Sequence, residues 1–351
     1  MGAVPIRSAI VLVESPAGLF CPAGTFHVDP WGPVERAVIT HGHGDHARPG
    51  SAAYLCAEPC GPVLRRRFGP EATIETLAYG QKTRVGEIEL SFHPAGHVLG
   101  SAQVRIEGRE GVWVVAGDYK RAPDPTCTAF EPIRCDTFIT ESTFGLPIYW
   151  WDPTASVIAD IVGWWRRNRE EGRTSVLFCY TLGKAQRLLA ELAAVTDREV
   201  LVHGMMLGMI EVYRAAGVPM LPVRVVTERK RGTSFAGELV LAPLSARGTP
   251  WMRRLGEFSD AFASGLMRVR GVRRQRAFDR GFVLSDHADW PALLTTIGET
   301  GAARVLASHG HAAPLARHLS ESGLEAGVIR TAWEGEAEAD DAPAPGASAE
   351  G

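Results

Sequence analysis

Short apolar runs alternate with helical patterns along most of the chain. The runs end in polar loops and are typical of buried strands. Helical spacing is clearest at Ala185, Leu188, Leu189 and Leu192, which share one helix face. Strands that alternate with helices predict an α/β fold. The predicted strands are 37–40, 112–116, 137–140, 176–180, 200–203, 238–242, 281–284 and 304–308.

Histidines and acids come directly after several of these predicted strands. They are a cluster that includes Asp45, then Asp118, Glu141, His287 and His309. The carboxyl ends of strands in one sheet share an edge, and α/β proteins place their sites there. We therefore expect side chains that are far apart in the sequence to meet in one site.

The middle of the chain, 146–275, has its own strand–helix alternation and carries none of the obvious ligand clusters. It is predicted to be a domain inserted between two parts of a metal-binding domain, 1–145 and 276–333. The last segment, 334–351, holds six acids and no base among Ala, Gly and Pro. Such a segment cannot bury a core, so we expect it to be disordered.

Composition is that of a globular chain, with 351 residues, 45% of them hydrophobic and 22% charged. The sequence has no apolar run near the roughly 20 residues that cross a bilayer. It also shows no signal-peptide pattern at its start, so we expect a cytoplasmic protein. The six cysteines contain no CxxC pair and are predicted to be reduced thiols rather than disulfides.

Positive charge is concentrated in one segment, although the formal net charge is −3. Residues 247–280 hold nine arginines against three acids. Arginine pairs with phosphate through two parallel hydrogen bonds, so these side chains are predicted to guide a nucleic-acid strand. The alternative is a solvated basic face that pairs with acids nearby. The arginines closest to the His287 loop are Arg268, Arg270, Arg273, Arg274 and Arg276.

The strongest chemical signal is the run His-Gly-His-Gly-Asp-His at 41–46. Three imidazoles and a carboxylate within six residues suit zinc, manganese or iron. His97, Asp118 and His309 would supply a bridging carboxylate and closing ligands for two ions, which in such sites lie about 3.5–4 Å apart. Each of these three residues is weak evidence alone, because a single histidine more often packs in a core or on the surface.

Three motifs resemble the metallo-β-lactamase superfamily: 41–46, Ala-Gly-His-Val-Leu-Gly at 95–100, and Gly-Asp-Tyr at 117–119. The resemblance implies an αββα sandwich and two divalent metal ions, zinc first and manganese as the alternative. It also implies that Asp29, in His-Val-Asp-Pro-Trp, orients the ligand loop without touching a metal. The implied ligands are His41, His43 and His97 for one ion, Asp45, His46 and His309 for the other, and Asp118 as the bridge.

Further motifs resemble the β-CASP nucleases of that superfamily. Thr-Glu-Ser-Thr-Phe-Gly at 140–145 is similar to motif A, Ser-Asp-His-Ala-Asp-Trp at 285–290 to motif B, and His309 to motif C. The insert 146–275 would then be the β-CASP domain. Such a site hydrolyses phosphodiesters, with Asp45 in the catalytic set and His287 as proton donor to the leaving oxygen, its other ring nitrogen bonded to Glu141. The alternative is that His287 only caps a turn.

Within that group the chain is most similar to bacterial ligase-associated DNA exonucleases. The segments 20–24, 27–31, 46–51, 116–120, 135–148 and 279–290 carry this likeness. It implies a DNA substrate, a role in DNA repair or end processing, and a functional link to an ATP-dependent DNA ligase. One departure is glycine rather than alanine at 42 and 44, which we expect to loosen the loop without removing a ligand.

Three other functions remain open at this point. The same motifs serve RNA-processing nucleases, and nothing in them separates the two sugars. A catalytically dead scaffold fits less well, because every ligand position is filled. A small-molecule hydrolase would lack the insert and the three β-CASP motifs.

Overall fold

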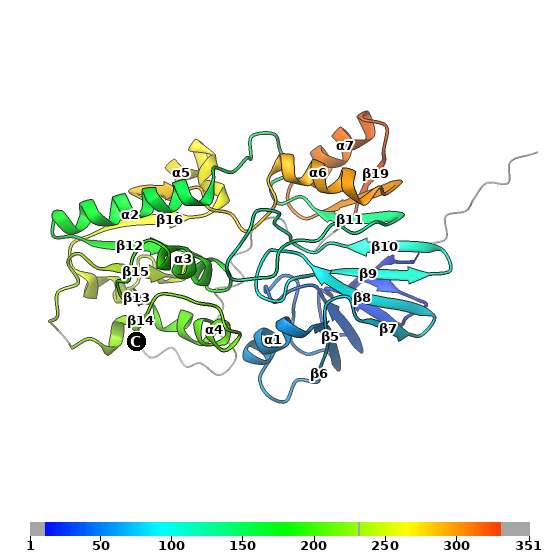
Figure 1. Cartoon of the computed structure of the whole chain (residues 1–351), viewed down its shortest axis with the longest axis horizontal. Coiled ribbons are helices and arrows are strands. Elements are labelled where there is room, and N and C mark those ends of the chain that lie inside the picture. Colours follow the sequence, from blue (N-terminus) through cyan, green and yellow to red (C-terminus); the bar gives the residue numbers. More distant parts are fainter. Residues whose placement is uncertain (1–10, 231, 331–351) are drawn as a thin grey trace, which may run out of the picture.

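The computed structural model describes residues 11–230 and 232–330, so the predicted tail 334–351 lies outside the described residues. Figure 1 shows two units side by side: blue, cyan and orange elements on the right, green and yellow elements on the left. The first unit contains two sheets and the second contains one.

The two sheets of the first unit differ in strand direction. In the first sheet β3 to β6 run parallel, and in the second sheet β7 to β10 run antiparallel. The first sheet has the order β1 (Val13–Ser15), β2 (Gly18–Cys21), β3 (Phe26–Val28), β4 (Arg36–Ile39), β5 (Ala53–Ala57), β6 (Ile74–Leu77). The second has the order β19 (Glu325–Val328), β18 (Arg304–Ser308), β11 (Thr137–Glu141), β10 (Gly111–Val115), β9 (Ala102–Gly108), β8 (Ile88–Pro94), β7 (Lys82–Val85).

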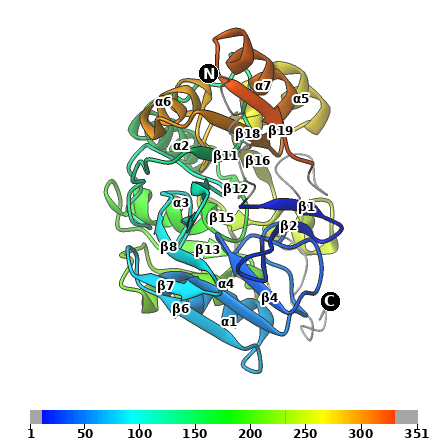
Figure 2. The ribbon, with the colours of Figure 1, turned by 90° about the vertical axis from the view of Figure 1, so that its right-hand side faces the viewer.

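These two sheets face each other across one core. Phe26 and Val38 of the first sheet pack in the same buried cluster as Phe92, Val104 and Trp113 of the second. Helices α6 (Trp290–Thr300) and α7 (Ala312–Glu321) cover the outer face of the second sheet, and α1 (Gly61–Phe68), preceded by the 3-10 turn η1 (Glu58–Cys60), covers the first. Figure 2 shows α6 and α7 at one end of this unit and α1 at the other. The layers therefore run helix, sheet, sheet, helix.

The third sheet is parallel and has both faces covered. Helices α2 (Thr154–Glu170), α3 (Lys184–Ala193) and α4 (Gly204–Ala215) bury one face. The other face packs on η2 (Val226–Glu228), η3 (Leu244–Ala246), η4 (Pro250–Leu255) and η5 (Gly265–Arg268), and α5 (Arg270–Arg276) follows η5. The strand order is β14 (Val223–Val225), β13 (Val200–Val202), β15 (Leu239–Ala242), β12 (Thr174–Phe178), β16 (Phe258–Ala263), β17 (Arg280–Phe282).

The predicted α/β class is confirmed, and each predicted apolar run contains a strand. The pattern did not identify the antiparallel strands β7 to β9, which are joined by short turns rather than by helices. The division at 145 and 275 stays a prediction. β17 comes after the predicted boundary at 275, yet it pairs with β16 and so belongs to the third sheet.

The described residues contain no helix that is both long and apolar enough to cross a membrane. All six cysteines are free thiols, as predicted.

Candidate metal centre

The predicted ligands gather at one edge of the sandwich, where strands end. His41 follows β4, Asp118 follows β10 and His309 follows β18, while Glu141 is the last residue of β11. His97 lies in the turn between β8 and β9. The ligand-forming atoms fall into three groups, each within 4.8 Å of one another: His41, His43, His97 and Asp118; Asp45, His46 and His309; and Asp118, Glu141 and His287.

Three imidazoles and one carboxylate of the first group converge on a single point. The Nδ1 atom of His43 lies 3.1 Å from Nε2 of His41 and 3.0 Å from Nε2 of His97. An Asp118 oxygen lies 3.4 Å from Nε2 of His41 and 3.7 Å from Nε2 of His97. Donors bound tetrahedrally to zinc at about 2.0–2.1 Å would lie about 3.3–3.4 Å apart, so this group fits a small divalent cation.

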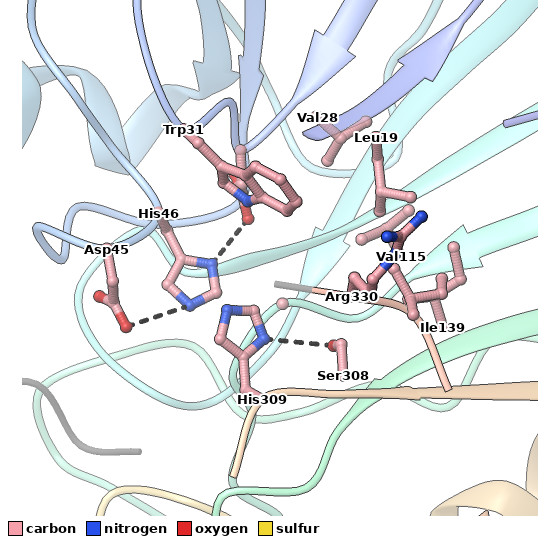
Figure 3. Close-up of a pocket in the computed structure, with 13 residues that line it drawn as sticks. Leu19, Val28, Trp31, Asp45, His46, Val115, Ile139, Ser308, His309 and Arg330 are labelled. Atoms are coloured by element: carbon pink, nitrogen blue, oxygen red, sulfur yellow. Dashed lines mark hydrogen bonds and ion pairs between the residues drawn. The ribbon is translucent and has the colours of Figure 1, made fainter. Parts of the chain in front are cut away.

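The second group meets the first at Asp118. Nε2 of His46 is buried without a hydrogen-bond partner, although it lies 3.5 Å from Oδ1 of Asp118 and 3.8 Å from Oδ2 of Asp45. A buried, unpaired nitrogen between two carboxylates is the arrangement that a cation would complete. Figure 3 shows Asp45, His46 and His309 pointing toward one another at the polar end of a pocket lined beyond them by Leu19 and Val28.

The outward nitrogen of each ligand histidine is held by a group that fixes its tautomer. Carbonyl oxygens accept from Nδ1 of His97 and Nε2 of His43, so the inward nitrogen keeps its lone pair. Thr40 donates to Asp29 and Ser308 donates to a carbonyl, so each hydroxyl accepts from the neighbouring imidazole. The pairs are His97–Asp286 carbonyl (2.7 Å), His43–Leu182 carbonyl (3.2 Å), His41–Thr40 (3.1 Å) and His309–Ser308 (3.2 Å).

Asp29 joins the two halves of this network. One of its oxygens accepts from Nδ1 of His46 at 2.8 Å and from the Thr40 hydroxyl at 2.6 Å. The other accepts from the Thr40 amide at 2.8 Å. Its φ of 44° is left-handed, a conformation that Asp and Asn tolerate better than most residues. The sequence prediction for Asp29 matches this position beside the ligand loop.

Burial and nearby charges set the protonation of the cluster. Burial lowers the pKa of His41 to about 4, and burial with neighbouring imidazoles lowers the pKa of His97 well below its usual value. Burial also opposes charge on His46, but Asp118 and Asp45 outweigh it and raise the pKa of that imidazole. The carboxylates therefore favour positive charge at the point where the two groups meet.

His287 and Glu141 form the contact that the sequence predicted for them. Nδ1 of His287 lies 3.0 Å from Oε2 of Glu141, whose other oxygen accepts from the Tyr119 amide at 2.8 Å. Burial raises the pKa of Glu141 despite the opposing effect of His287. The backbone of His287 is fixed as well, because the Trp151 indole donates to its carbonyl at 2.9 Å.

A buried ion network behind His97 was missed by the sequence interpretation. Asp286 lies 2.9 Å from Lys184 and 2.8 Å from Arg187, and all three are buried. Arg187 also contacts Asp124, which pairs with Lys120. Burial would raise the pKa of Asp286, but Lys184 and Arg187 outweigh it and hold that pKa well below its usual range. The available signal was a charged pair at 184 and 187 beside the apolar helix face of Ala185, Leu188, Leu189 and Leu192.

The network has a consequence for the cluster. Asp286 is the residue whose carbonyl holds His97, and Lys184 and Arg187 come from α3 of the other unit. The third sheet is therefore attached to a metal-ligand position through buried charges.

The predicted arginine stripe is only partly described. The helix α5 contains Arg270 to Arg276, but the side chains of Arg273 and Arg276 lie outside the described residues. Arg270 and Arg274 are exposed and line an open hollow with Phe278. Arg268 is half-buried, stacks on Trp150 and lies 3.4 Å from Asp152.

Gly42 is packed tightly rather than loosely. A Cβ added there would lie 2.5 Å from Cγ1 of Val63, a side chain of α1. Glycine at this position therefore lets the ligand loop approach the helix, which differs from the expected loosening.

No family model matches the chain. Its relatives among known proteins align either with most of the chain or with about a third of it. A probable DNA ligase of Opitutus terrae is 32% identical over 89% of this chain and 30% of its own length. Endoribonuclease YSH1 of Yarrowia lipolytica is 30% identical over 33% of this chain and 14% of its own. A ribonuclease of Thermus thermophilus is 31% identical over 32% of this chain and 32% of its own. The chain thus spans a third or less of these relatives.

A solved structure, a protein of unknown function from Enterococcus faecalis, has a TM-score of 0.55 with 12% identity and covers 86% of this chain and 80% of its own. That likeness shows the fold alone. Fold and site define an α/β protein with a buried His/Asp cluster at a sheet edge. Its homologues include β-CASP members of the metallo-β-lactamase superfamily, the group that its motifs resemble.

Proposed function

We propose that this chain is a metal-dependent nuclease that hydrolyses DNA phosphodiester bonds as an exonuclease in DNA repair or end processing, linked to a DNA ligase. The observation that supports it best is the convergence of the predicted ligands with their outward nitrogens bonded. The four layers of helix, sheet, sheet and helix fit the metallo-β-lactamase arrangement, and the third sheet fits the inserted domain. A cytoplasmic location remains our prediction.

The proposed site has two kinds of residue: those that would bind the metal ions and those that would transfer a proton. One ion would be held by His41, His43, His97 and Asp118. The second would be held by Asp45, His46, His309 and the shared Asp118. Two divalent ions, which we propose to be zinc with manganese as the alternative, would supply Lewis acidity toward phosphate and a low-pKa water. Asp45 also belongs to the proposed catalytic set, in which its carboxylate would orient that water.

His287 is the proposed proton donor to the leaving sugar oxygen. Its Nδ1 donates to Glu141, so the proton that is transferred would be carried on Nε2. The buried carboxylate keeps the ring in one orientation and supports the imidazolium before transfer. The indole of Trp151 and the Ser285 hydroxyl hold the backbone on either side of that ring.

The choice of DNA rests on coverage. The ligase-named relative aligns with most of this chain, whereas the ribonuclease-named relatives align with about a third. The link to an ATP-dependent DNA ligase rests on that one relative and on the motif likeness. RNA processing is the second candidate, favoured by the printed names of the shorter matches.

The test uses DNA and RNA oligonucleotides of the same sequence, labelled at either end, with zinc or manganese. We expect a ladder of DNA products from one end, and little RNA cleavage. The control is Asp118→Ala purified in the same way, which removes the carboxylate shared by both groups. Cleavage that survives in the control would reveal a contaminating nuclease, and equal or preferred RNA cleavage would replace DNA in the proposal.

The role of His287 has its own variant. His287→Ala should keep full metal occupancy and lose turnover by about 10²–10⁴-fold, the usual worth of a positioned acid. Wild-type turnover at full occupancy would contradict the role.

A further inference from the structure

Trp150 is an exposed aromatic side chain on the loop that joins β11 to α2. It is 47% exposed, whereas Trp164 and Trp165, on α2, are each 4% exposed and bonded through their indoles. Its neighbour Trp151 donates to the carbonyl of His287. Trp150 therefore lies one residue from a direct contact with the proposed proton donor.

One face of the Trp150 ring is covered by a guanidinium. The central carbon of Arg268 lies 3.1 Å from the ring centroid, and Asp152 holds the same guanidinium at 3.4 Å. Arginine and tryptophan in this arrangement attract through the ring quadrupole and stack as flat groups. Arg268 comes from η5, which packs on the third sheet, so the stack joins that sheet's unit to the loop between β11 and α2.

The loop that carries Trp150 is packed against Phe144 on both sides of that residue. Phe144 packs edge-on against Tyr149 and Trp151, with centroids 4.8 Å apart in both cases. A Cβ on Gly265 would lie 2.5 Å from that Phe144 ring, so glycine lets η5 approach closely. The approach brings Arg268 over Trp150 and fixes the stack in one place.

A cavity of about 250 Å³ is lined by His287 and by Asp152, and Asp152 also contacts the Arg268 guanidinium of the stack. Lys120, Arg121 and Trp151 also line this cavity, where Lys120 pairs with Asp124 and Arg121 pairs with Glu299. Cationic groups in the cavity lining and a flat aromatic group on the neighbouring loop match the two parts of a nucleotide, phosphate and base.

We propose that the stack of Trp150 and Arg268 binds one unpaired nucleobase next to the bond that is cut. This inference rests on the proposed nuclease function and deepens it, because it names the substrate as a single-stranded end or overhang. A base inside a duplex has both faces covered by its neighbours, whereas an unpaired base offers the indole a free face. Stacking of this kind is tolerant of sequence, since every base has a π-face.

The test measures binding and cleavage of single-stranded DNA by Trp150→Ala, Trp150→Phe and Ile148→Ala. Ile148, 51% exposed on the same loop, is the matched control. A stacked base is usually worth enough that Trp150→Ala should raise KM for single-stranded DNA by about 5- to 150-fold with little change in kcat. Trp150→Phe should recover most of that loss, and Ile148→Ala should resemble wild type.

An abasic scan locates the contact and separates stacking from general damage. Wild type should lose affinity mainly when one particular base is missing, and Trp150→Ala should be insensitive to that same omission. A 2-aminopurine placed at that position should be quenched on binding to wild type. These readouts use wild type as well, so they decide the matter even if a variant fails to fold.

The outcomes distinguish the two claims. If wild type binds and cleaves no nucleic acid, the proposed function itself fails. If wild type cleaves DNA but Trp150→Ala equals Ile148→Ala, or the abasic scan is flat, the stacking site is wrong while the nuclease stands. A preference of wild type for blunt duplex over single strands would also overturn it.

Discussion

Asp29→Asn is the substitution that tests the orienting network most sharply. Asparagine has the same shape and tolerates the left-handed φ of 44°, so the backbone should keep its conformation. What changes is the chemistry of one atom: Oδ2, which now accepts from the Thr40 hydroxyl and from His46, would become an amide donor if the Thr40 amide keeps Oδ1.

The effect propagates to both groups of ligands. Facing an N–H group, His46 must accept at Nδ1, so its proton moves to Nε2, the buried atom between Asp45 and Asp118. The Thr40 hydroxyl must likewise accept from the amide, so it turns its own proton toward His41. The first change puts a proton on Nε2 of His46, and the second favours a proton on Nε2 of His41. A cation needs a lone pair on both of these atoms.

The magnitude follows from the bonds that are lost. Two hydrogen bonds to a carboxylate are worth about 1.5–3 kcal/mol each, and substitutions of such orienting groups typically cost about 10–100-fold in metal affinity. We therefore expect Asp29→Asn to weaken zinc or manganese binding by about 10–100-fold, as measured by competition with a chelator of known affinity.

Asp160→Asn is the matched control, since Asp160 is 70% exposed on α2 and far in the sequence from any ligand. It should bind metal as wild type does. Metal affinity of Asp29→Asn within about twofold of wild type would refute the reasoning that the outward hydrogen bonds set the ligand tautomers, given the factor expected for such groups.

Three further outcomes are expected. Gly42→Ala should lower stability and activity, because Val63 blocks the added methyl, and Gly42→Ala with Val63→Ala should recover both; an active, stable single variant would contradict this. Asp286→Asn should lower the free energy of urea unfolding by about 3–5 kcal/mol, because it removes the carboxylate charge that pairs with the buried Lys184 and Arg187, whereas Asp160→Asn should not. Chelation should lower the thermal midpoint, and excess zinc should restore it. Zinc at a hundredfold over Kd should add about 2.7 kcal/mol to the free energy of unfolding, and an unchanged midpoint would count against metal binding.

The metal cluster was predictable because its signal is local. The run 41–46 concentrates donors after a strand, and strand ends bring Asp118 and His309 to the same edge. The resemblance then assigned each position, and the structure brings those side chains together without testing the ions themselves.

The supporting contacts were not predictable, because they depend on tertiary packing. The carbonyls of Leu182 and Asp286 that hold His43 and His97 have no sequence signature, since every residue has a carbonyl. The close approach of Gly42 to Val63 reversed the expectation of a loose loop, because a glycine pattern does not say what lies beside it. The stack of Trp150 on Arg268 joins residues that are far apart in the sequence, so spacing alone could not pair them.

Metal content tests the central claim most directly. Purified protein should be stripped, titrated with zinc and counted by elemental analysis, beside Asp118→Ala, which lacks the carboxylate common to both groups. The account predicts two tightly bound ions per wild-type chain and a loss in the variant. Wild-type protein that binds one ion or none under these conditions, or a variant that still binds two equally tightly, would contradict it.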